Sequence, residues 1–376
     1  MKATKHEQPR GNPLVMAVSG VLTLGLLLGM LTMGSTPAAA SAGNIDVMDT
    51  FERDLANQVS GVLEGVIPTR RVYQLSDSDI VAPEPDPDGY GQTGDPAQMR
   101  SVLDQAAVLL EGQQTLFTIE TPIKDGSTIH YYLDETIFAV TWKQVVDDCT
   151  YTFSEVKIAH ASQLRRFLSE GKYNSGILHT TTEMSASVNA VVASSGDYYG
   201  YRSIGIVVND GQVYRGMGHY LDTCYIDENG DLLFSYAGDF TDKETAQKFV
   251  DEHNVRFSLC FGPVMVLEGE YCVPATYNSG EINDPYARAA LCQMDKLHYV
   301  VVAANAEEPN YSMPTVGEFG RRLQEMGIPT AYALDGGQTA AIVMNDQLIN
   351  TVSYGYQREI SDIFYFATAL PDSGKK

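Results

Sequence analysis

The stretch TAYALDGGQTAAIVMNDQLIN, residues 330–350, decides how the C-terminal half of this chain is interpreted. TAYAL predicts a buried strand, and Asp335 stands at its C-terminal end, followed by Gly336 and Gly337. Glycine is needed where φ is positive or where another group comes close to the backbone, and both needs arise at the mouth of a site. An acid in a plain turn would give the same letters, so this stretch alone supports either interpretation.

Other segments also place an acid, a glycine or an arginine at a strand end. The apolar run VNAVVA leads into Gly196 and Asp197, which two tyrosines follow. LCFGPVMV breaks at Gly262 and Pro263, and Arg288 directly precedes the apolar AALC. Several strands therefore end in residues that could line one site.

Tight turns divide the region after residue 150 into short strands. Hairpin turns are predicted at residues 209–211, 228–230, 268–269 and 345–346, each between strand-like runs. No regular alternation of strand and helix and no repeat period is present. The sequence therefore predicts an α+β fold with mostly antiparallel sheets and a few packed helices.

Two helices are expected within this region. TDKETAQKFVDEH carries a capping box formed by Thr241 and Glu244. TVGEFGRRLQEMG ends on Gly327, as a helix C-terminus prefers.

The N-terminus predicts export. Lys2, Lys5 and Arg10 precede a segment without charge, residues 11–45, whose apolar part covers residues 14–33. That part is long for a signal peptide and just long enough to span a bilayer, with the basic residues on the cytoplasmic side. Residues 1–45 are therefore either a basic tail with an uncleaved anchor or a signal peptide cut within STPAAASAG. In both cases the rest of the chain is expected outside the cytoplasm.

Residues 46–148 are expected to form a small α+β unit. DVMDTFERDLANQVSGVLEGVI has one apolar helical stripe, and residues 81–94, rich in Pro, Gly and Asp, predict an extended connector. A helix opens at Asp95 and closes at Gly112, and TLFTI, TIHYYL and TIFAVTW predict strands. No motif here suggests chemistry, so the unit is interpreted as a spacer or docking unit.

Charge and cysteine content limit the partners. The formal net charge of -23 argues against nucleic acid, because phosphate would be repelled. Among 5 cysteines, Cys260 and Cys272 flank a predicted hairpin and are the best pair for a disulfide, although buried free thiols fit equally well. No CxxC pair or HExxH motif is present, so no metal site is indicated and any cofactor is unknown.

The order of the motifs resembles the phosphodiester glycosidase family, whose members include relatives of the lysosomal uncovering enzyme that removes N-acetylglucosamine from a phosphodiester. The resemblance rests on GDYY, DGQVYR, FGPVMVLEG, a Pro-Arg segment, LHYVVVAA, GEFGRRLQEMGIPTAYALDGGQT and REISD. It implies a phosphodiester glycosidase domain over residues 149–372.

The resemblance also implies site residues. Asp335, Asp197 and Glu183 are the candidate catalytic carboxylates, because carboxylates stabilise an oxocarbenium-like centre, attack it or activate water. A phosphate leaving group needs a cation, and Arg288 matches the family arginine. Gly336 and Gly337 would present backbone N–H groups to substrate oxygens, and the candidate substrate-binding side chains are those of Thr339, Ser195 and Tyr198.

Structural roles compete with these assignments, and the sequence departs from the family pattern. Glu183 also fits a helix cap, and Arg358 fits a structural partner better than a catalyst. Gln338, Thr339 and Ala340 stand where the family usually carries serines, Cys292 stands at a glycine position, and Ser195 stands where asparagine is common. The departures bear on substrate identity and activity.

The resemblance leads to the hypothesis of a cell-surface glycosidase that cleaves a sugar from a phosphodiester-linked glycan of the envelope. Its partners would be that glycan and the membrane, through the N-terminal helix; a cleaved signal would make the protein secreted. Two alternatives use the same site: a non-catalytic glycan-binding descendant of the family, and a transglycosylase in exopolysaccharide assembly.

Overall fold

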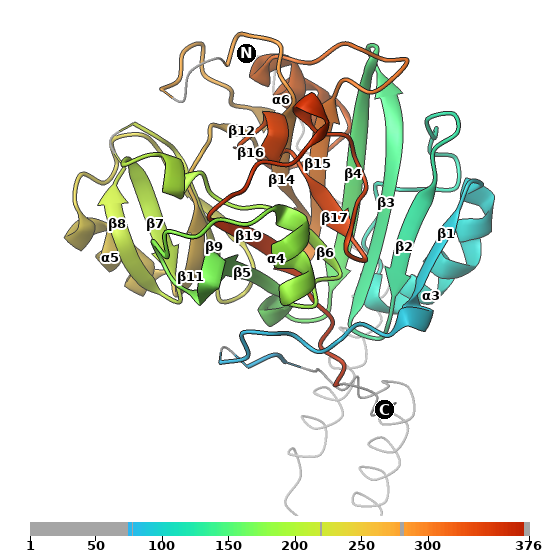
Figure 1. Cartoon of the computed structure of the whole chain (residues 1–376), viewed down its shortest axis with the longest axis horizontal. Helices are drawn as coiled ribbons and strands as arrows, with labels where there is room; N and C mark the ends of the chain where they lie inside the picture. The colour runs from blue at the N-terminus through green and yellow to red at the C-terminus, as the bar shows by residue number, and fades with distance from the viewer. Residues whose placement is uncertain (1–73, 77, 219, 279–281, 372–376) are drawn as a thin grey trace, which may run out of the picture. The chain divides into compact units, whose positions relative to one another are not determined.

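Three antiparallel sheets dominate the part of the chain that the computed structural model describes, residues 74–371 apart from 77, 219 and 279–281 (Figure 1). Four α-helices pack on them, so the α+β prediction is confirmed for this part. The apolar segment of residues 14–33 and the helix predicted to follow residue 45 lie outside the described residues. Among the residues that are described, no helix has both the length and the apolar character to cross a membrane.

The largest sheet has nine strands in the order β1-β2-β3-β4-β15-β14-β16-β12-β13. In chain order, the strands are β1 (Tyr90–Thr93), β2 (Ile129–Leu133), β3 (Ile137–Val146), β4 (Cys149–Ile158), β12 (Val264–Leu267), β13 (Glu270–Tyr271), β14 (Arg288–Asp295), β15 (His298–Asn305) and β16 (Thr330–Leu334). The predicted buried strand TAYAL is β16, which lies between β14 and β12.

Strands from the N-terminal third belong to this same sheet. β3 pairs with β4 over its whole length, and a two-residue turn, Asp147 and Asp148, joins them. The rings of Trp142 and Phe153 stack across the pair at 5.1 Å. The predicted domain boundary between residues 148 and 149 therefore falls at the end of a β-hairpin turn, whereas the role of residues 46–148 as a spacer or docking unit stays a prediction.

Two five-stranded sheets complete the fold. The first has the order β10-β9-β11-β7-β8 and the second has the order β18-β17-β6-β19-β5. The strands of the first are β7 (Gly205–Asn209), β8 (Gln212–Met217), β9 (Thr223–Asp227), β10 (Leu232–Ser235) and β11 (Val255–Leu259); those of the second are β5 (Leu164–Leu168), β6 (Val192–Ser195), β17 (Ile342–Met344), β18 (Gln347–Leu348) and β19 (Asp362–Phe366).

The largest sheet is covered on both faces. One face packs on both smaller sheets through a shared core that includes Tyr299, Tyr332, Phe364 and Phe257. The other face packs on helices α3 (Arg100–Leu110) and α6 (Val316–Glu325), whereas α4 (Thr181–Ser187) and α5 (Lys243–Glu252) cover the outer faces of the smaller sheets. The strand ends of all three sheets are thereby fixed by burial, which gives their loops a rigid support.

Local predictions are confirmed at the four hairpin turns, which join β7 to β8, β9 to β10, β12 to β13 and β17 to β18. Asp95 caps the turn that leads into α3, and Thr315 with Glu318 forms a capping box on α6, which ends before Gly327 at φ 81°. The cap of α5 is Asp242 rather than Thr241, because the Asp242 carboxylate accepts the hydrogen bond from the Thr245 N–H.

Three other local predictions are wrong. TLFTI forms no strand, because the N–H groups of Leu116 and Phe117 donate to the buried Glu155 carboxylate instead of a neighbouring strand. The connector of residues 81–94 ends in strand β1, which pairs with β2. All five cysteines are free thiols; Cys260 is buried and Cys272 is exposed, so the suggested disulfide is not formed.

Candidate functional site

The turn after β16 is shaped by the backbone of a neighbouring strand. A Cβ on Gly336 would lie 2.0 Å from the carbonyl oxygen of Ala287, so only glycine fits there. Gly337 has φ 67°, and its N–H donates to the same carbonyl at 3.0 Å. The Gly336 N–H donates to Oδ1 of Asp335 at 3.0 Å. Both N–H groups are bonded within the chain, and their predicted contact with substrate oxygens stays untested.

Two of the predicted substrate-binding hydroxyls hold this turn in place. Thr339 Oγ1 donates to the Gly336 carbonyl at 2.8 Å, and Ser195 Oγ donates to the Thr339 carbonyl at 2.6 Å. Both side chains lie on buried residues. The hydroxyls therefore fix the position of Asp335, and any contact between them and a substrate stays a prediction.

The Asp335 carboxylate is largely buried and faces an arginine. Its Oδ2 lies 3.6 Å from Nη1 of Arg358 and forms no hydrogen bond with the described residues. Burial raises the pKa of Asp335 above its usual value, while Arg358, Thr339 and Arg202 act in the opposite direction. Arg358, which was expected to be a structural partner, forms an ion pair with the candidate catalytic carboxylate.

A second arginine rests on aromatic rings beside this pair. The Arg202 guanidinium lies 4.8 Å from the ring centre of Tyr198 and 4.7 Å from that of Phe261. Arg358 lies 5.5 Å from the Tyr198 ring, so Tyr198 contacts both arginines. Within the described residues, Arg202 makes these ring contacts but no side-chain hydrogen bond. Its N–H donors are therefore available to an anion.

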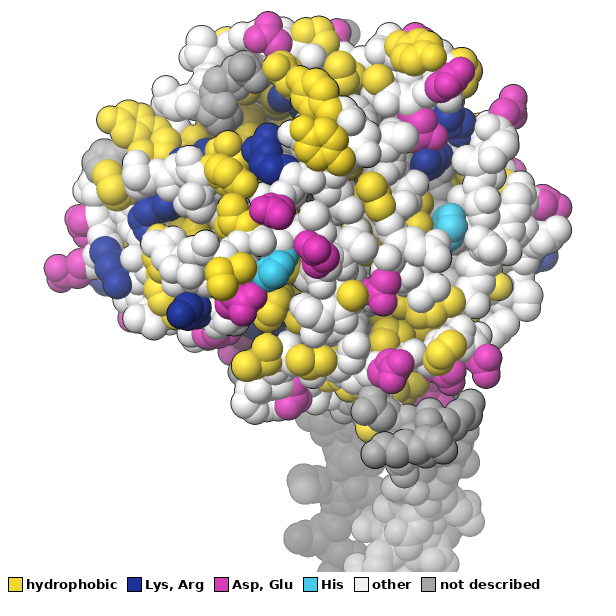
Figure 2. Space-filling model, viewed as in Figure 1, with side chains coloured by type: hydrophobic (Ala, Val, Ile, Leu, Met, Phe, Trp, Pro, Cys, Tyr) yellow, Lys and Arg dark blue, Asp and Glu magenta, His cyan; other side chains and the backbone are white. Residues whose placement is uncertain are grey.

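A cavity of about 490 Å³ opens next to the Asp335 turn. Gly337, Gln338 and Arg358 line one part of it, and the exposed rings of Tyr286 and Tyr354 line another. Figure 2 shows basic side chains beside hydrophobic ones in a hollow between α4 and α6, whereas acidic side chains are scattered over the rest of that face. A pocket lined by an arginine and aromatic rings, with the buried Asp335 carboxylate paired to that arginine, is suited to a ligand with both an anionic group and a sugar.

Asp197 lies in a separate, fully buried ion cluster. Arg166 donates from Nε to Asp362 Oδ2 at 2.7 Å, and its Nη2 lies 3.8 Å from Asp197 Oδ2. The Asp197 N–H donates to both Asp362 carboxylate oxygens, at 3.0 and 3.1 Å. Burial raises the pKa of Asp197 to about 7, because Arg166 only partly offsets burial and the nearby Asp362 charge. Asp362 supports the backbone that leads directly into Tyr198.

Among the described residues, the Asp197 cluster and Asp335 are linked only indirectly, through a shared charged neighbour. Arg202 stabilises the ionised forms of both Asp197 and Asp335. The Asp197 carboxylate is wholly buried, so it does not reach the cavity surface. Asp335 is therefore the better placed of the two for direct contact with a substrate.

Arg288 and Glu183 are engaged elsewhere. Arg288 donates from Nε to the Pro314 carbonyl at 3.2 Å and from Nη2 to the Asp284 carbonyl at 2.5 Å. Glu183 accepts hydrogen bonds from the N–H and hydroxyl of Thr180 in a capping box at the start of α4. These contacts favour structural roles for both, and their predicted roles in phosphate binding and catalysis stay untested.

The residues that sequence reasoning passed over are Arg166, Arg202 and Asp362. Asp362 closes REISD, a segment already singled out in the sequence, and Arg202 lies three residues after GDYY. Arg166 lies in LRRFL, where nothing in the letters separates a buried strand arginine from an exposed one. Among the described residues, no group of three or more His, Cys, Asp or Glu side chains is placed to hold a metal ion.

Comparison with known proteins finds a family model that matches part of the C-terminal half. Residues 183–367 match the family model described as phosphodiester glycosidase. Among solved structures, the catalytic domain of zebrafish N-acetylglucosamine-1-phosphodiester alpha-N-acetylglucosaminidase, auto-inhibited by its pro-peptide, is similar at 15% identity and a TM-score of 0.50, over 66% of this chain and 85% of that one. This likeness shows a shared fold.

Two further solved structures are less similar. A protein from Synechocystis aligns at 13% identity and a TM-score of 0.45, over 66% of this chain and 65% of that one. A protein from Burkholderia pseudomallei aligns at 12% identity and a TM-score of 0.39, over 58% and 74% of the two chains. No curated protein matches the sequence.

Proposed function

We propose that this chain, residues 183–367 of which match the phosphodiester glycosidase family model, cleaves the glycosidic bond of a sugar phosphodiester. The observation that carries the proposal is the ion pair between Asp335 and Arg358, a residue that lines the cavity of about 490 Å³. A carboxylate and a cation side by side match the two charges of this reaction, which are positive at the sugar carbon and negative at the leaving phosphate.

In this proposal the arginines hold the phosphate. Arg202 has no hydrogen-bond acceptor among the described residues, and about a third of the Arg358 side chain, 32%, is exposed. Each guanidinium can offer two parallel N–H groups to phosphate oxygens. The phosphate monoester then leaves with the electron pair of the broken bond, and its charge is neutralised where it forms.

Asp335 acts on the sugar side. As the bond between the anomeric carbon and the phosphate oxygen breaks, the ionised carboxylate stabilises the positive carbon, attacks it, or takes the proton from the water that does so. The water oxygen ends on the anomeric carbon and one water proton is released. Arg358 favours the ionised form of Asp335 in a setting where burial opposes it.

The location and natural substrate belong to the same proposal. The uncharged segment of residues 11–45 behind three basic residues supports a domain held at the outer face of the membrane. A phosphodiester-linked glycan of the envelope is the sugar phosphodiester that such a domain would meet. On a chain of net charge -23, the arginines of the site supply the local positive potential that an anionic group of such a glycan needs.

An isotope-labelling experiment that identifies the broken bond tests the proposed reaction. The full chain is incubated in heavy-oxygen water with methyl N-acetylglucosamine-1-phosphate, and the products are weighed by mass spectrometry. A glycosidase places the heavy oxygen on the released sugar and leaves methyl phosphate unlabelled. Label in the phosphate would identify a phosphodiesterase and contradict the proposal, as would the absence of cleavage across a panel of such diesters.

A further inference from the structure

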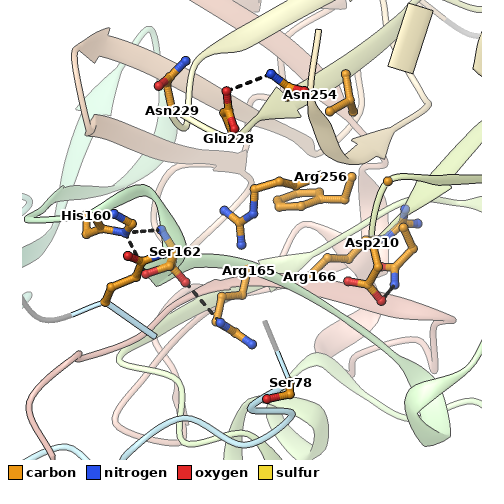
Figure 3. Close-up of a pocket in the computed structure, with 15 residues that line it drawn as sticks. Ser78, His160, Ser162, Arg165, Arg166, Asp210, Glu228, Asn229, Asn254 and Arg256 are labelled. Carbon is orange, nitrogen blue, oxygen red and sulfur yellow. Dashed lines mark hydrogen bonds between the residues drawn. The ribbon is translucent and has the colours of Figure 1, made fainter. Parts of the chain in front are cut away.

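A second, larger cavity lies apart from the Asp335 site. It has a volume of about 910 Å³ and shares no lining residue with the first. Its mouth is formed by three exposed turns, around Asp210, Glu228 and Asn254, and its base by the start of strand β5. Figure 3 shows Arg165 and Arg256 inside it, with the Glu228 and Asn254 pair at one end and Asp210 at another.

The base carries a buried arginine, Arg165, that pairs with no carboxylate among the described residues. Arg165 is only 8% exposed, and its guanidinium donates to the carbonyls of Ser76, Asp79 and Ser162 and to the Tyr365 hydroxyl. These partners satisfy the N–H groups but carry no charge, and within the described residues Arg165 has no acidic partner. A buried cation whose described partners are all neutral gives this wall a positive potential that favours an anionic group.

Arg256 reaches the same space from strand β11. Its Nη1 donates to the carbonyls of Ala161 and Leu164, which fixes the side chain across the gap between two sheets. Arg166 also lines the cavity, but its charge is used by Asp362 and Asp197 behind the wall. Two arginines from different sheets are therefore held in place beside one cavity before any ligand arrives, which lowers the entropic cost of binding.

The mouth offers hydrogen-bond groups of the kind that sugar hydroxyls need. Glu228 Oε1 accepts from Asn254 Nδ2 at 2.8 Å, and Asp210 Oδ2 accepts from Asn209 Nδ2 at 2.7 Å. The second carboxylate oxygen of each acid has no side-chain donor among the described residues. Amide and carboxylate oxygens accept hydrogen bonds from hydroxyl groups, and amide N–H groups also donate hydrogen bonds to them.

We propose that this cavity is a binding site for an anionic sugar, with the anionic group at Arg165 and Arg256 and the hydroxyls at the acidic and amide mouth. A carboxylate and a phosphate on the sugar share this chemistry. The site goes beyond the proposed catalysis, because it uses none of the residues around Asp335. It would hold an acidic glycan at a place distinct from the point of cleavage.

Isothermal titration of the full chain tests the site with four probes: glucuronate, glucose 6-phosphate, neutral glucose and inorganic phosphate. We expect one of the two anionic sugars to bind at least about tenfold more tightly than glucose and than inorganic phosphate. The better of the two identifies the anionic group. No binding of either sugar would overturn the proposal, and so would glucose or phosphate binding as tightly as the better sugar.

A matched pair of variants locates the binding. Asn254 has φ 48°, so Asn254→Gly removes its amide without backbone strain, and Asn345, with φ 50° in an exposed turn elsewhere, allows the same change as a control. We expect Asn254→Gly to weaken the anionic sugar roughly three- to tenfold and Asn345→Gly to leave its affinity unchanged. Equal affinities in both variants would overturn the placement.

Sugar binding by a variant of the first site distinguishes a failure of the catalytic proposal from a failure of the second-site proposal. Asp335→Asn should bind the anionic sugar as tightly as the unaltered chain, because the two cavities share no lining residue. Loss of binding in Asp335→Asn would assign the sugar to the first cavity and overturn the second site.

Discussion

Asp335 Oδ2 lies 3.6 Å from Arg358 Nη1, and within the described residues this oxygen forms no hydrogen bond. The separation is longer than a charge-assisted hydrogen bond, so the pair attracts without being locked together. A phosphate that enters the cavity can therefore bind Arg358 while the carboxylate stays beside the sugar.

Activity should depend on the planar guanidinium groups of the two arginines of the site. Arg358→Lys and Arg202→Lys keep a positive charge but cannot bind a phosphate at two points, so each should lower kcat/KM for a sugar phosphodiester about ten- to a hundredfold. Arg321→Lys is the control, because Arg321 also rests on a ring, that of Tyr271 at 4.6 Å, but on helix α6. Steady-state kinetics that show equal effects at all three positions would exclude a phosphate clamp.

The pH dependence of turnover should reveal the ionisation of Asp335. Burial raises its pKa above the usual 3.8, so activity that needs the carboxylate should fall as the pH drops through this raised pKa. Arg358 acts to lower the pKa, so Arg358→Gln should move the acid limb of the kcat/KM profile to higher pH. An acid limb that stays in place or moves to lower pH would show that Asp335 is not the titrating group.

Asp197 should make stability depend on pH with the opposite sign to an ordinary salt-bridged aspartate. Its pKa is raised from 3.8 to about 7, so the folded state binds the proton more tightly than the unfolded state. That contribution is fully present below pH 3.8 and is lost as the pH rises towards about 7. Relative to Asp197→Asn, the unaltered chain should lose free energy of unfolding across this range.

Urea denaturation at about pH 5 and about pH 8 measures this difference. The same substitution at the exposed Asp104 gives the background change. A difference between the unaltered chain and Asp197→Asn that stays constant, or that grows in favour of the unaltered chain with pH, would mean that Asp197 is ionised throughout.

Removal of the N-terminal strands should disrupt folding. A chain that begins at Thr150 lacks β1, β2 and β3, so β4 becomes an open edge and Phe153 loses its contact with Trp142. Expression of this chain should give insoluble protein, whereas a chain that begins at Arg71, where the larger compact unit starts, should fold. A soluble chain from Thr150 with a cooperative thermal transition would restore residues 46–148 as a dispensable unit.

The sequence predicts local structure here better than it predicts side-chain partners. The hairpin turns and the end of α6 before Gly327 were predictable because short-range hydrogen bonds and local backbone conformation decide them. TLFTI was misread because a buried carboxylate 38 residues away, that of Glu155, binds the Phe117 N–H. No local pattern contains that partner.

The absence of long-range partners from local patterns also explains which features of the candidate site could not be predicted. Asp335 could be singled out because it follows a predicted strand and precedes two glycines. The glycines were read as room for a ligand, whereas the close group is the Ala287 carbonyl of a neighbouring strand, 2.0 Å from where a Cβ on Gly336 would lie. Which arginine faces Asp335 depends on how β14, β16 and the segment before β19 meet, and that arrangement is set by packing among three sheets.

The measurement that tests the central claim most directly compares Asp335→Asn with the unaltered chain on one sugar-1-phosphodiester that the chain cleaves. Asparagine keeps the shape but not the charge, so release of the free sugar should fall on the order of a hundredfold or more. The thermal midpoint should change little, since Oδ2 makes no hydrogen bond with the described residues and Oδ1, which accepts from Gly336, has an amide equivalent. Asp104→Asn, at an exposed position of α3, should leave turnover unchanged. Sugar release by Asp335→Asn at the rate of the unaltered chain, or a collapse of its thermal midpoint, would contradict a catalytic role for Asp335.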